Sequence, residues 1–448
     1  MEKQKSIAII GAGPAGTTLA CLLAKRGIRC CVFDDNKRPD LLVGESLVSA
    51  VVPILRELGI EDQVAKISQR KAGAALRHPN GLRADFLFKD FGQKAPDYSY
   101  NIPRPQFDTI LRQRAESSGV VFINQRAQLN RVQSSGEREL ALSAESLKQA
   151  GFAPNTHPDL LIDATGRHRL FSRILELPEE RGNRDDISYF AHYSGFEAPS
   201  HAEGQIVLTV LKEGWSWQIP LKDRVSVGVV IDKKLATAYG KTPEERLEAV
   251  INHNPQLQHN GKHRRRISKV VAYANYQMRS QKAHGKGWAL LGDALAFTDP
   301  MLSPGLYMAM LSAKRLEHHL FLPKHDLATR LKNYAGEMYR WHDAWDETIR
   351  YFYDGRLLGL LEAGNKVADN SPKISFQRLM RWHLKRVLSS MVSGVNTTSK
   401  YNQKMLFYSC KHLIENPEDI NNYQIEPNHQ DDIKTNIKQS ESELHFSQ

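Results

Sequence analysis

The sequence predicts an α/β fold in which a Rossmann-like domain with a parallel sheet is interleaved with a mixed β-sheet domain, followed by a helical C-terminal region. Three observations predict it. A glycine-rich loop follows a short apolar run at residues 6–10, alternating apolar runs fill residues 187–234, and the pattern from residue 306 onward is mostly helical. A strand that enters a glycine turn and a helix favours parallel βαβ units, whereas short alternating strands favour a separate mixed sheet.

The length and composition exclude several classes of protein. The chain has 448 residues, of which 41% are hydrophobic and 25% charged, so it is neither wholly disordered, nor collagen-like, nor a membrane-embedded bundle. Lys and Arg number 61 against 50 Asp and Glu, which gives a formal net charge of +11. This charge favours an acidic partner, but it does not choose among nucleic acid, anionic lipid, a phosphorylated cofactor and an acidic carrier protein.

Cysteine usage and the amino terminus indicate a reducing compartment. The 4 cysteines, Cys21, Cys30, Cys31 and Cys410, form no CxxC pair, so neither a disulfide framework nor a metal site is expected. The first apolar stretch is too short for a signal peptide, and no apolar run approaches the roughly 20 residues of a membrane span. We therefore expect a cytoplasmic protein without a transmembrane segment.

The amino-terminal loop has the pattern of a dinucleotide site. It reads Gly11-Ala12-Gly13-Pro14-Ala15-Gly16. A helix-like segment, 17–26, follows it, and a strand-like run, 28–33, ends at Asp34. Gly11 permits the tight turn, Gly13 lets the backbone approach a pyrophosphate, and Gly16 lets helix and strand pack closely. Because Asp34 can accept hydrogen bonds from a ribose diol, the sequence predicts a Rossmann-like nucleotide site, without separating NAD from FAD.

A second nucleotide element is indicated further along the chain. Residues 288–291 form another apolar strand-like run, followed by Gly292 and Asp293. A carboxylate at a strand end, just before a helix, can hold the ribityl chain of a flavin. The alternative is an ordinary N-cap aspartate, and the motif alone leaves both open.

Several segments around these elements resemble the flavin-dependent halogenases. They are Gly44-Glu45-Ser46-Leu47, Asn101-Ile102-Pro103-Arg104 with Phe107-Asp108, Asp163-Ala164-Thr165-Gly166, Gly214-Trp215-Ser216-Trp217-Gln218-Ile219-Pro220, and Phe297, Pro300, Ser303 and Gly305 in an FxxPxxSxG pattern. The likeness runs from about residue 5 to about residue 325 and looks closest to the branch acting on phenols and carrier-bound pyrroles. It implies an FAD-dependent oxidoreductase of the aromatic monooxygenase superfamily.

The resemblance implies which residues hold FAD. They are Gly11, Gly13, Pro14, Ala15, Gly16, Asp34, Glu45, Ser46, Arg104, Gly292, Asp293, Pro300 and Gly305. The sequence has no second GxGxxG that would mark a nicotinamide site. In this family a separate flavin reductase supplies the reduced FAD, so we expect such a reductase as a partner.

The resemblance also implies a halide site and two tryptophans at the flavin. The loop before the helical region would frame a halide with backbone N–H groups near Ser303, Pro304 and Gly305. Pro304 departs from the family pattern, because proline has no N–H and one potential donor is lost. In the family, the tryptophans that match Trp215 and Trp217 stand beside the flavin and hinder monooxygenation; the alternative is two alternating core aromatics.

The catalytic residue that the resemblance implies is a lysine. Residues 69–74, QRKAGA, resemble the family's K-x-G-A segment, and Lys71 falls on the lysine that aims hypohalous acid. An ammonium suits this role, because it is a compact donor on a flexible stem whose pKa falls on burial. The alternative is a surface lysine in a basic run that includes Lys66 and Arg70.

Two functions stay open on this scaffold. The first is halogenation of an electron-rich aromatic (a phenol, pyrrole or indole, free or carrier-bound) with reduced FAD, dioxygen and halide. The second is halide-independent hydroxylation of an aromatic, including a tryptophan within a protein substrate during quinone-cofactor maturation, and Pro304 favours it. A geranylgeranyl-type reductase and a non-enzymatic flavin-binding module fit the motifs less well, and no nucleic-acid partner is expected.

We expect four parts in the chain. Residues 1–75, 101–186 and 276–325 form a discontinuous FAD-binding domain, and residues 76–100 and 187–275 a substrate-side sheet domain. Residues 326–414 form the helical C-terminal region, whose aromatic run ending at Tyr353 either walls a flat pocket or packs in the core. Residues 415–448 are polar and form a flexible tail.

Overall fold

The computed structural model describes residues 6–39, 41–91, 96–132, 139–182, 184–274, 277–370, 383, 385–413, 420 and 422–425. The chain divides into two compact units, each assembled from three segments that are not adjacent in sequence. The first unit comprises Met1–Ile67, Arg104–Gly182 and Gln277–Trp345. The second comprises Ser68–Pro103, Asn183–Tyr276 and Asp346–Gln448.

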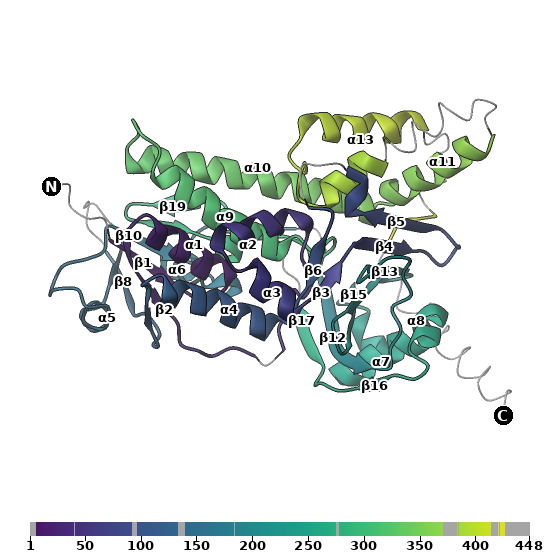
Figure 1. Cartoon of the computed structure of the whole chain (residues 1–448), viewed down its shortest axis with the longest axis horizontal. Coiled ribbons are helices and arrows are strands. Elements are labelled where there is room, and N and C mark those ends of the chain that lie inside the picture. Colours follow the sequence, from purple (N-terminus) through teal and green to yellow (C-terminus); the bar gives the residue numbers. More distant parts are fainter. Residues whose placement is uncertain are drawn as a thin grey trace. The chain divides into compact units, whose positions relative to one another are not determined.

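The first unit is built around the predicted parallel sheet, labelled in Figure 1. Within the described residues its strand order is β19 (His284–Gly285), β20 (Trp288–Leu290), β10 (Leu160–Asp163), β1 (Ser6–Ile10), β2 (Arg29–Phe33), β7 (Val121–Ile123). All neighbours pair in parallel except β19, a short antiparallel edge strand. The central strands are buried apolar runs, as expected for a sheet covered on both faces. The strands predicted at residues 6–10 and 28–33 are confirmed.

Helices and short strands complete the first unit. The helix α1 (Pro14–Lys25) packs against α9 (Gly305–Leu320) and α4 (Arg104–Ser117). It begins at Pro14, a residue suited to the first turn because that turn needs no backbone N–H. The remaining elements are η1 (Ser49–Val51), α2 (Val52–Leu58), α3 (Glu61–Ile67), β8 (Leu129–Arg131), β9 (Leu140–Leu142), α5 (Ala144–Gln149), η3 (Gly166–His168), α6 (Leu170–Leu175), β11 (Glu179–Arg181), β18 (Met278–Ser280), η5 (Gly292–Ala294), β21 (Ala296–Phe297) and most of α10 (Leu327–Tyr353).

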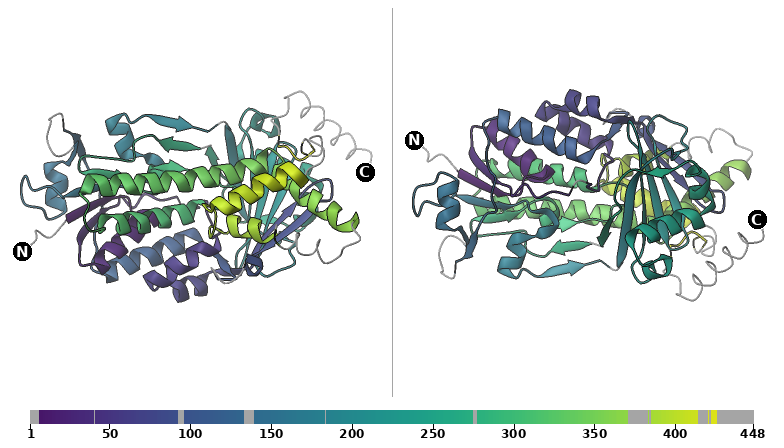
Figure 2. Two further views of the ribbon diagram at one scale, coloured as in Figure 1. Left: turned by 90° about the horizontal axis from the view of Figure 1, so that it is seen from above. Right: turned by 90° about the horizontal axis from the view of Figure 1, so that it is seen from below.

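The second unit is built around the predicted mixed sheet, whose strands lie side by side in the right-hand view of Figure 2. In the described part of the chain the order is β16 (Arg265–Arg266), β12 (Asp186–Ser194), β15 (Val225–Asp232), β14 (Gly214–Pro220), β13 (Ile206–Leu211), β4 (Gly73–Arg77), β5 (Arg83–Leu87), with β17 (Val271–Ala274) also on β12. One face packs its apolar side chains with those of α7 (Pro243–His253) and α8 (Pro255–Asn260). The opposite face carries the two tryptophans of β14.

Shorter elements finish the second unit. The strands β3 (Gln69–Lys71) and β6 (Ser99–Asn101) form an antiparallel pair. The others are η2 (Phe88–Phe91), η4 (Ala236–Tyr239), the end of α10, α11 (Arg356–Asn370) and α13 (Lys400–Leu413).

The observed units differ in their bounds from the four expected parts. Residues 68–75 lie in the second unit, because β3 pairs with β6 and β4 pairs with β13 and β5. The region expected at 326–414 divides within α10, between Trp345 and Asp346. Of the expected tail, 415–448, the structure describes residues 420 and 422–425, and the rest lies outside the described residues.

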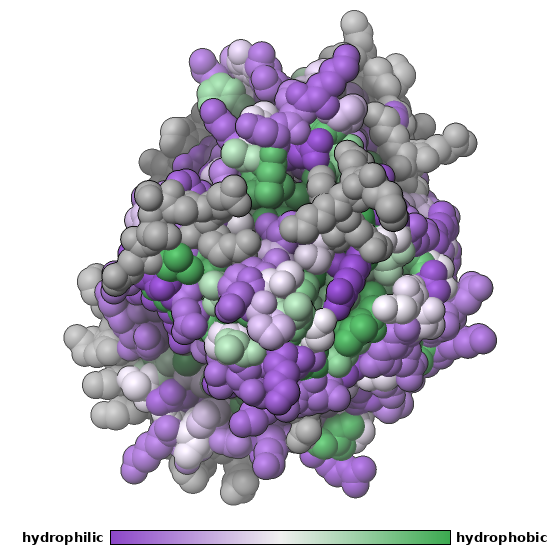
Figure 3. Space-filling model, turned by 90° about the vertical axis from the view of Figure 1, so that its left-hand side faces the viewer, coloured by the Kyte–Doolittle hydropathy of each residue, from purple (hydrophilic) through white to green (hydrophobic). Residues whose placement is uncertain are grey.

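Among the residues that are described, no helix has both the length and the apolarity needed to cross a membrane. The face shown in Figure 3 is predominantly hydrophilic, with apolar side chains scattered between polar ones. Single exposed apolar residues of this kind are ordinary on a protein surface.

Candidate active site

The glycine loop lies at the carboxyl end of β1, against the turn that follows β10. Gly11 has a φ of +108°, and a Cβ on it would lie 2.3 Å from the carbonyl oxygen of Ala164. A Cβ on Gly16 would lie 2.1 Å from the carbonyl oxygen of Gly11. A Cβ on Gly13 would meet no atom within 4 Å. Two glycines thus allow close packing, while the third borders open space at the amino terminus of α1, where a pyrophosphate would fit.

Two further motifs lie next to this loop. Gly292 is so close to the start of α1 that a Cβ on it would be 2.9 Å from the Cβ of Ala15. The Gly292 N–H donates to the Ser312 hydroxyl on α9 at 3.0 Å. Asp163 accepts from the N–H and the hydroxyl of Thr165, at 2.9 and 2.6 Å, which fixes the turn after β10. Motifs at residues 11, 163 and 292 therefore meet around one helix terminus.

The predicted GESL segment and Arg104 also come together. Arg104 is the first residue of α4, and its Nη1 donates to the carbonyl oxygen of Val43 at 2.5 Å. A Cβ on Gly44, whose φ is +93°, would lie 2.9 Å from the same Nη1. Glu45 and Ser46 are buried. The glycine at position 44 thus lets the guanidinium of Arg104 approach this segment.

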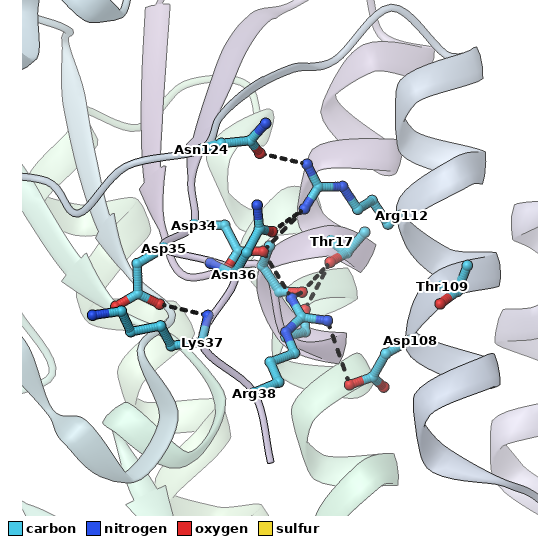
Figure 4. A network of polar contacts seen from close by, with 12 residues as sticks. Thr17, Asp34, Asp35, Asn36, Lys37, Arg38, Asp108, Thr109, Arg112 and Asn124 are labelled. Atoms are coloured by element: carbon cyan, nitrogen blue, oxygen red, sulfur yellow. Dashed lines mark hydrogen bonds and ion pairs between the residues drawn. The ribbon is translucent and has the colours of Figure 1, made fainter. Parts of the chain in front are cut away.

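Two arginines converge on Asp34 at the end of β2 (Figure 4). Arg38 and Arg112 donate to Asp34 Oδ2 at 3.1 and 3.2 Å. Arg38 also donates to the carbonyl oxygen of Ala12 at 2.5 Å, and Arg112, on α4, donates to Asn124 at 2.7 Å. Sequence reasoning found Asp34 but missed both arginines. Arg38 lies four residues after Asp34, and this spacing was a signal that the sequence offered. Arg112 reaches Asp34 from α4, and no local pattern in the sequence indicates this contact.

Asp293 lies in η5, whose N-cap is Leu291, so the N-cap alternative for this aspartate is wrong. Desolvation raises the pKa of Asp293 from 3.8 to about 6, against the opposing charges of Arg167 and Arg104. Its carboxylate makes no hydrogen bond with the residues that the structure describes, so its oxygens are available to the hydroxyl groups of a ligand.

Replacing Asp293 by asparagine should stabilise the ligand-free protein and weaken FAD binding. Because the pKa of Asp293 is raised in the folded state, its ionisation opposes folding, and this cost grows as the pH rises from about 4 through 6. We expect Asp293→Asn to raise the free energy of unfolding by about 1–2 kcal/mol at pH 7.5 and to leave it unchanged near pH 4. Urea denaturation and FAD titration measure both effects, with the exposed Asp223→Asn as the control. An equal gain at both pH values would contradict the assignment of a raised pKa.

The loop between β21 and α9 has an unusual backbone. Leu302 and Ser303 have φ values of +67° and +59°, in the left-handed region that side chains other than glycine rarely adopt. The Ser303 N–H donates to the carbonyl oxygen of Pro300 at 3.0 Å, and Pro304, the N-cap of α9, has no N–H. A Cβ on Gly305 would meet no atom within 4 Å. Three backbone positions were predicted to frame a halide. The N–H of Ser303 is used within the loop, and Pro304 has none.

Lys71 belongs to the second unit, on β3, and is only 2% exposed. The surface-lysine alternative is therefore wrong. Desolvation lowers the pKa of Lys71 from 10.5 to about 7, and its Nζ lies 5.4 Å from the centre of the Phe88 ring. A buried amine whose charge changes near neutral pH is suited to proton transfer or to nucleophilic chemistry.

Trp215 and Trp217 are buried on one face of β14, in the same unit as Lys71. Their ring centres are 5.8 Å apart. The Trp217 ring lies over Gly228, where a Cβ would come within 2.2 Å of it, and the Trp217 indole N–H donates to Ser226 at 3.3 Å. The Trp215 indole N–H donates to the hydroxyl of Tyr353 at 2.9 Å, a partner that sequence reasoning did not identify.

Comparison with known proteins identifies the family. The model of the FAD binding domain family matches residues 4–337. The chain is 29% identical to the 1H-pyrrole-2-carbonyl-[peptidyl-carrier protein] chlorinase of Pseudomonas fluorescens, over 69% of this chain and 74% of that protein. It is 31% identical to the tryptophan 2-halogenase of Chondromyces crocatus, over 70% of this chain and 60% of that protein.

Solved structures share the fold. The flavoprotein/dehydrogenase from Cytophaga hutchinsonii superposes with a TM-score of 0.76 at 25% identity, covering 92% of this chain and 99% of that one. The flavin-dependent brominase Bmp2 superposes with a TM-score of 0.70 at 22% identity, covering 91% and 99%. With the family match over three quarters of the sequence and the halogenases among its relatives, the chain belongs to the FAD binding domain family and, within it, to the flavin-dependent halogenase family of FAD-dependent oxidoreductases.

Proposed function

We propose that the protein is an FAD-dependent halogenase of an electron-rich aromatic, with Lys71 as its catalytic residue. The observation that carries the proposal is the complete burial of this lysine together with a pKa lowered to about 7. Burial of a lysine is unfavourable because it desolvates the charged amine. A lysine kept in the core therefore has a role in chemistry and not in surface solubility. The named relatives act on a carrier-bound pyrrole and on tryptophan, which supports a pyrrole or indole type of ring, free or presented by a carrier protein.

We assign the first unit to FAD binding. The open space beside Gly13 receives the pyrophosphate, Asp34 the adenosine ribose, and Asp293 the ribityl hydroxyls. Arg38 and Arg112 hold the Asp34 carboxylate in position for the ribose. When bound, reduced FAD would supply two electrons to dioxygen. The oxygen activated in this way would oxidise a halide or oxygenate a ring. A separate flavin reductase provides the reduced cofactor.

Lys71 acts on the hypohalous acid. In its protonated form, Lys71 Nζ donates a hydrogen bond to the oxygen of hypohalous acid, which makes the halogen more electrophilic and directs it to the ring. The low exposure of the side chain keeps water away from the oxidant. The pairing of Lys71 with Ser99 between β3 and β6 fixes the backbone that carries the donor.

Halide-independent hydroxylation is the second candidate, and one observation favours it. Pro304 has no N–H, and the Ser303 N–H already donates to Pro300, so few donors remain for a halide in this loop. The substrate would then be an aromatic compound or a tryptophan within a protein.

Mass spectrometry of turnovers tests both candidates. The reaction contains reduced FAD from an added reductase and a panel of phenols, pyrroles and indoles, free and carrier-bound, with bromide and without halide. We expect a product with the bromine isotope pair, formed only with bromide. Pro304→Ser, which adds an N–H, should lower the bromide concentration needed for half-maximal product. A product heavier by one oxygen and formed equally without halide would overturn halogenation in favour of hydroxylation.

A further inference from the structure

An aromatic wall in the second unit is completed by residues that are far apart in sequence. It consists of Phe190, Trp217 and Trp215, whose successive ring centres are 5.8 Å apart, and Tyr353 at the end of α10. All four side chains are buried. The first three share one face of the mixed sheet, because Phe190 and Trp217 both pair with Gly228 on β15 and Trp215 lies two residues from Trp217.

The two tryptophans are fixed by different partners. Trp217 is held within the sheet, by Ser226 and by the close fit of its ring over Gly228. Trp215 has its indole N–H bonded to Tyr353 Oη at 2.9 Å. A buried indole N–H needs an acceptor, so Tyr353 selects the orientation in which Trp215 is held.

Tyr353 is itself held from several sides. The Arg184 guanidinium lies 4.0 Å from the centre of the Tyr353 ring, and Asp186 fixes that guanidinium through two hydrogen bonds of 2.7 and 2.9 Å. The Ile425 N–H donates to the Tyr353 carbonyl oxygen at 3.0 Å. A ring fixed in this way can impose its geometry on a neighbour instead of adapting to it.

We propose that Tyr353 is a positioning residue: by holding Trp215, it sets the fit of the aromatic substrate against the wall and so the fraction of oxidant that reaches the substrate. This inference rests on the proposed function, in either its halogenating or its hydroxylating form. If the aromatic wall tilts or loosens, the ring of the substrate is poorly oriented. A misplacement of about 1 Å can cost 100-fold in rate. The unused oxidant is then lost to solvent, as hypohalous acid in the halogenating form and as hydrogen peroxide in the hydroxylating form.

Tyr353→Phe tests the proposal, because it removes the acceptor and keeps the ring. We expect the product formed per reduced FAD to fall at least about fivefold, with a matching rise in released hypohalous acid or peroxide and a raised KM, while FAD affinity stays within about twofold of wild type. Tyr351→Phe, on the same helix turn and equally buried, is the matched control and should behave as wild type. An unchanged yield of product per reduced FAD in Tyr353→Phe, or an equal change in Tyr351→Phe, would overturn the proposal.

A second readout does not depend on turnover. The indole N–H resonance of Trp215, assigned by its loss in Trp215→Phe, should shift in Tyr353→Phe, and its exchange with solvent deuterium should accelerate at least tenfold. An unchanged resonance would overturn the positioning role. If wild type forms no product from any aromatic, the proposed function fails, whereas the resonance still reports whether Tyr353 holds Trp215.

Discussion

Replacing Lys71 by alanine should reduce the brominated product at least about 100-fold, the usual range for loss of a positioned proton donor. The reason is that Lys71 is the buried amine proposed to activate hypohalous acid, and alanine offers no donor. Product and peroxide are measured together by mass spectrometry and a peroxide assay, with FAD affinity as a check on the fold. Lys89→Ala changes an exposed lysine of the same unit and should be without effect. Full bromination in Lys71→Ala would remove this lysine from the mechanism.

The same lysine predicts a pH dependence. With a pKa of about 7, the Lys71 ammonium is present below this pH and lost above it. We therefore expect the bromination rate to fall as the pH rises above 7, and this limb to vanish in Lys71→Arg, which stays charged. A rate that rises instead would assign the reaction to the neutral amine.

Lys71 should also lower the stability of the protein. Because its pKa is lower in the folded than in the unfolded state, the cost of burying its charge is fully present below pH 7 and shrinks as the pH rises toward 10.5. Lys71→Met should accordingly raise the free energy of unfolding in acid and less so in alkali, while removing activity. Active-site groups commonly lower stability in this way.

The second large effect concerns two glycines of one loop, whose substitutions should separate folding from cofactor binding. Gly11→Ala adds a Cβ 2.3 Å from the Ala164 carbonyl oxygen at a φ of +108°, so we expect a loss of about 2–4 kcal/mol in the free energy of unfolding. Gly13→Ala adds a Cβ where nothing lies within 4 Å. It should leave the unfolding free energy of the ligand-free protein within about 0.5 kcal/mol and weaken FAD binding at least about tenfold.

Urea denaturation and FAD titration of the two variants check this contrast. Each variant serves as the control for the other, because the substitution is the same and the positions are two residues apart. Wild-type FAD affinity in Gly13→Ala would mean that the open space beside this glycine does not receive the pyrophosphate. Unaltered stability in Gly11→Ala would mean that the loop relaxes away from Ala164.

Local sequence patterns determined much of the fold. Residues 6–26 form the first strand and helix of a βαβ unit, and their apolar run, glycine turn and helical pattern involve near neighbours in sequence. Period-two alternation defines β13, β14 and β15. The local patterns also set the positions of three predicted cofactor ligands: Asp34 follows β2, Arg104 begins α4 and Asp293 lies in η5. The expected domain bounds differ from the observed units at residues 68–75, because strand partners distant in sequence decide where a short strand belongs.

The chemistry of the site was decided by the tertiary structure. From the sequence alone, Lys71 is either a catalytic lysine or a surface lysine. Packing decides that it is buried and that its pKa lies near 7. Likewise, the bond from Trp215 to Tyr353 joins positions 138 residues apart. The bond from Arg112 to Asp34 joins positions 78 residues apart. Periodicity and spacing report which side of an element a residue occupies, whereas desolvation and hydrogen-bond partners depend on which other elements pack there.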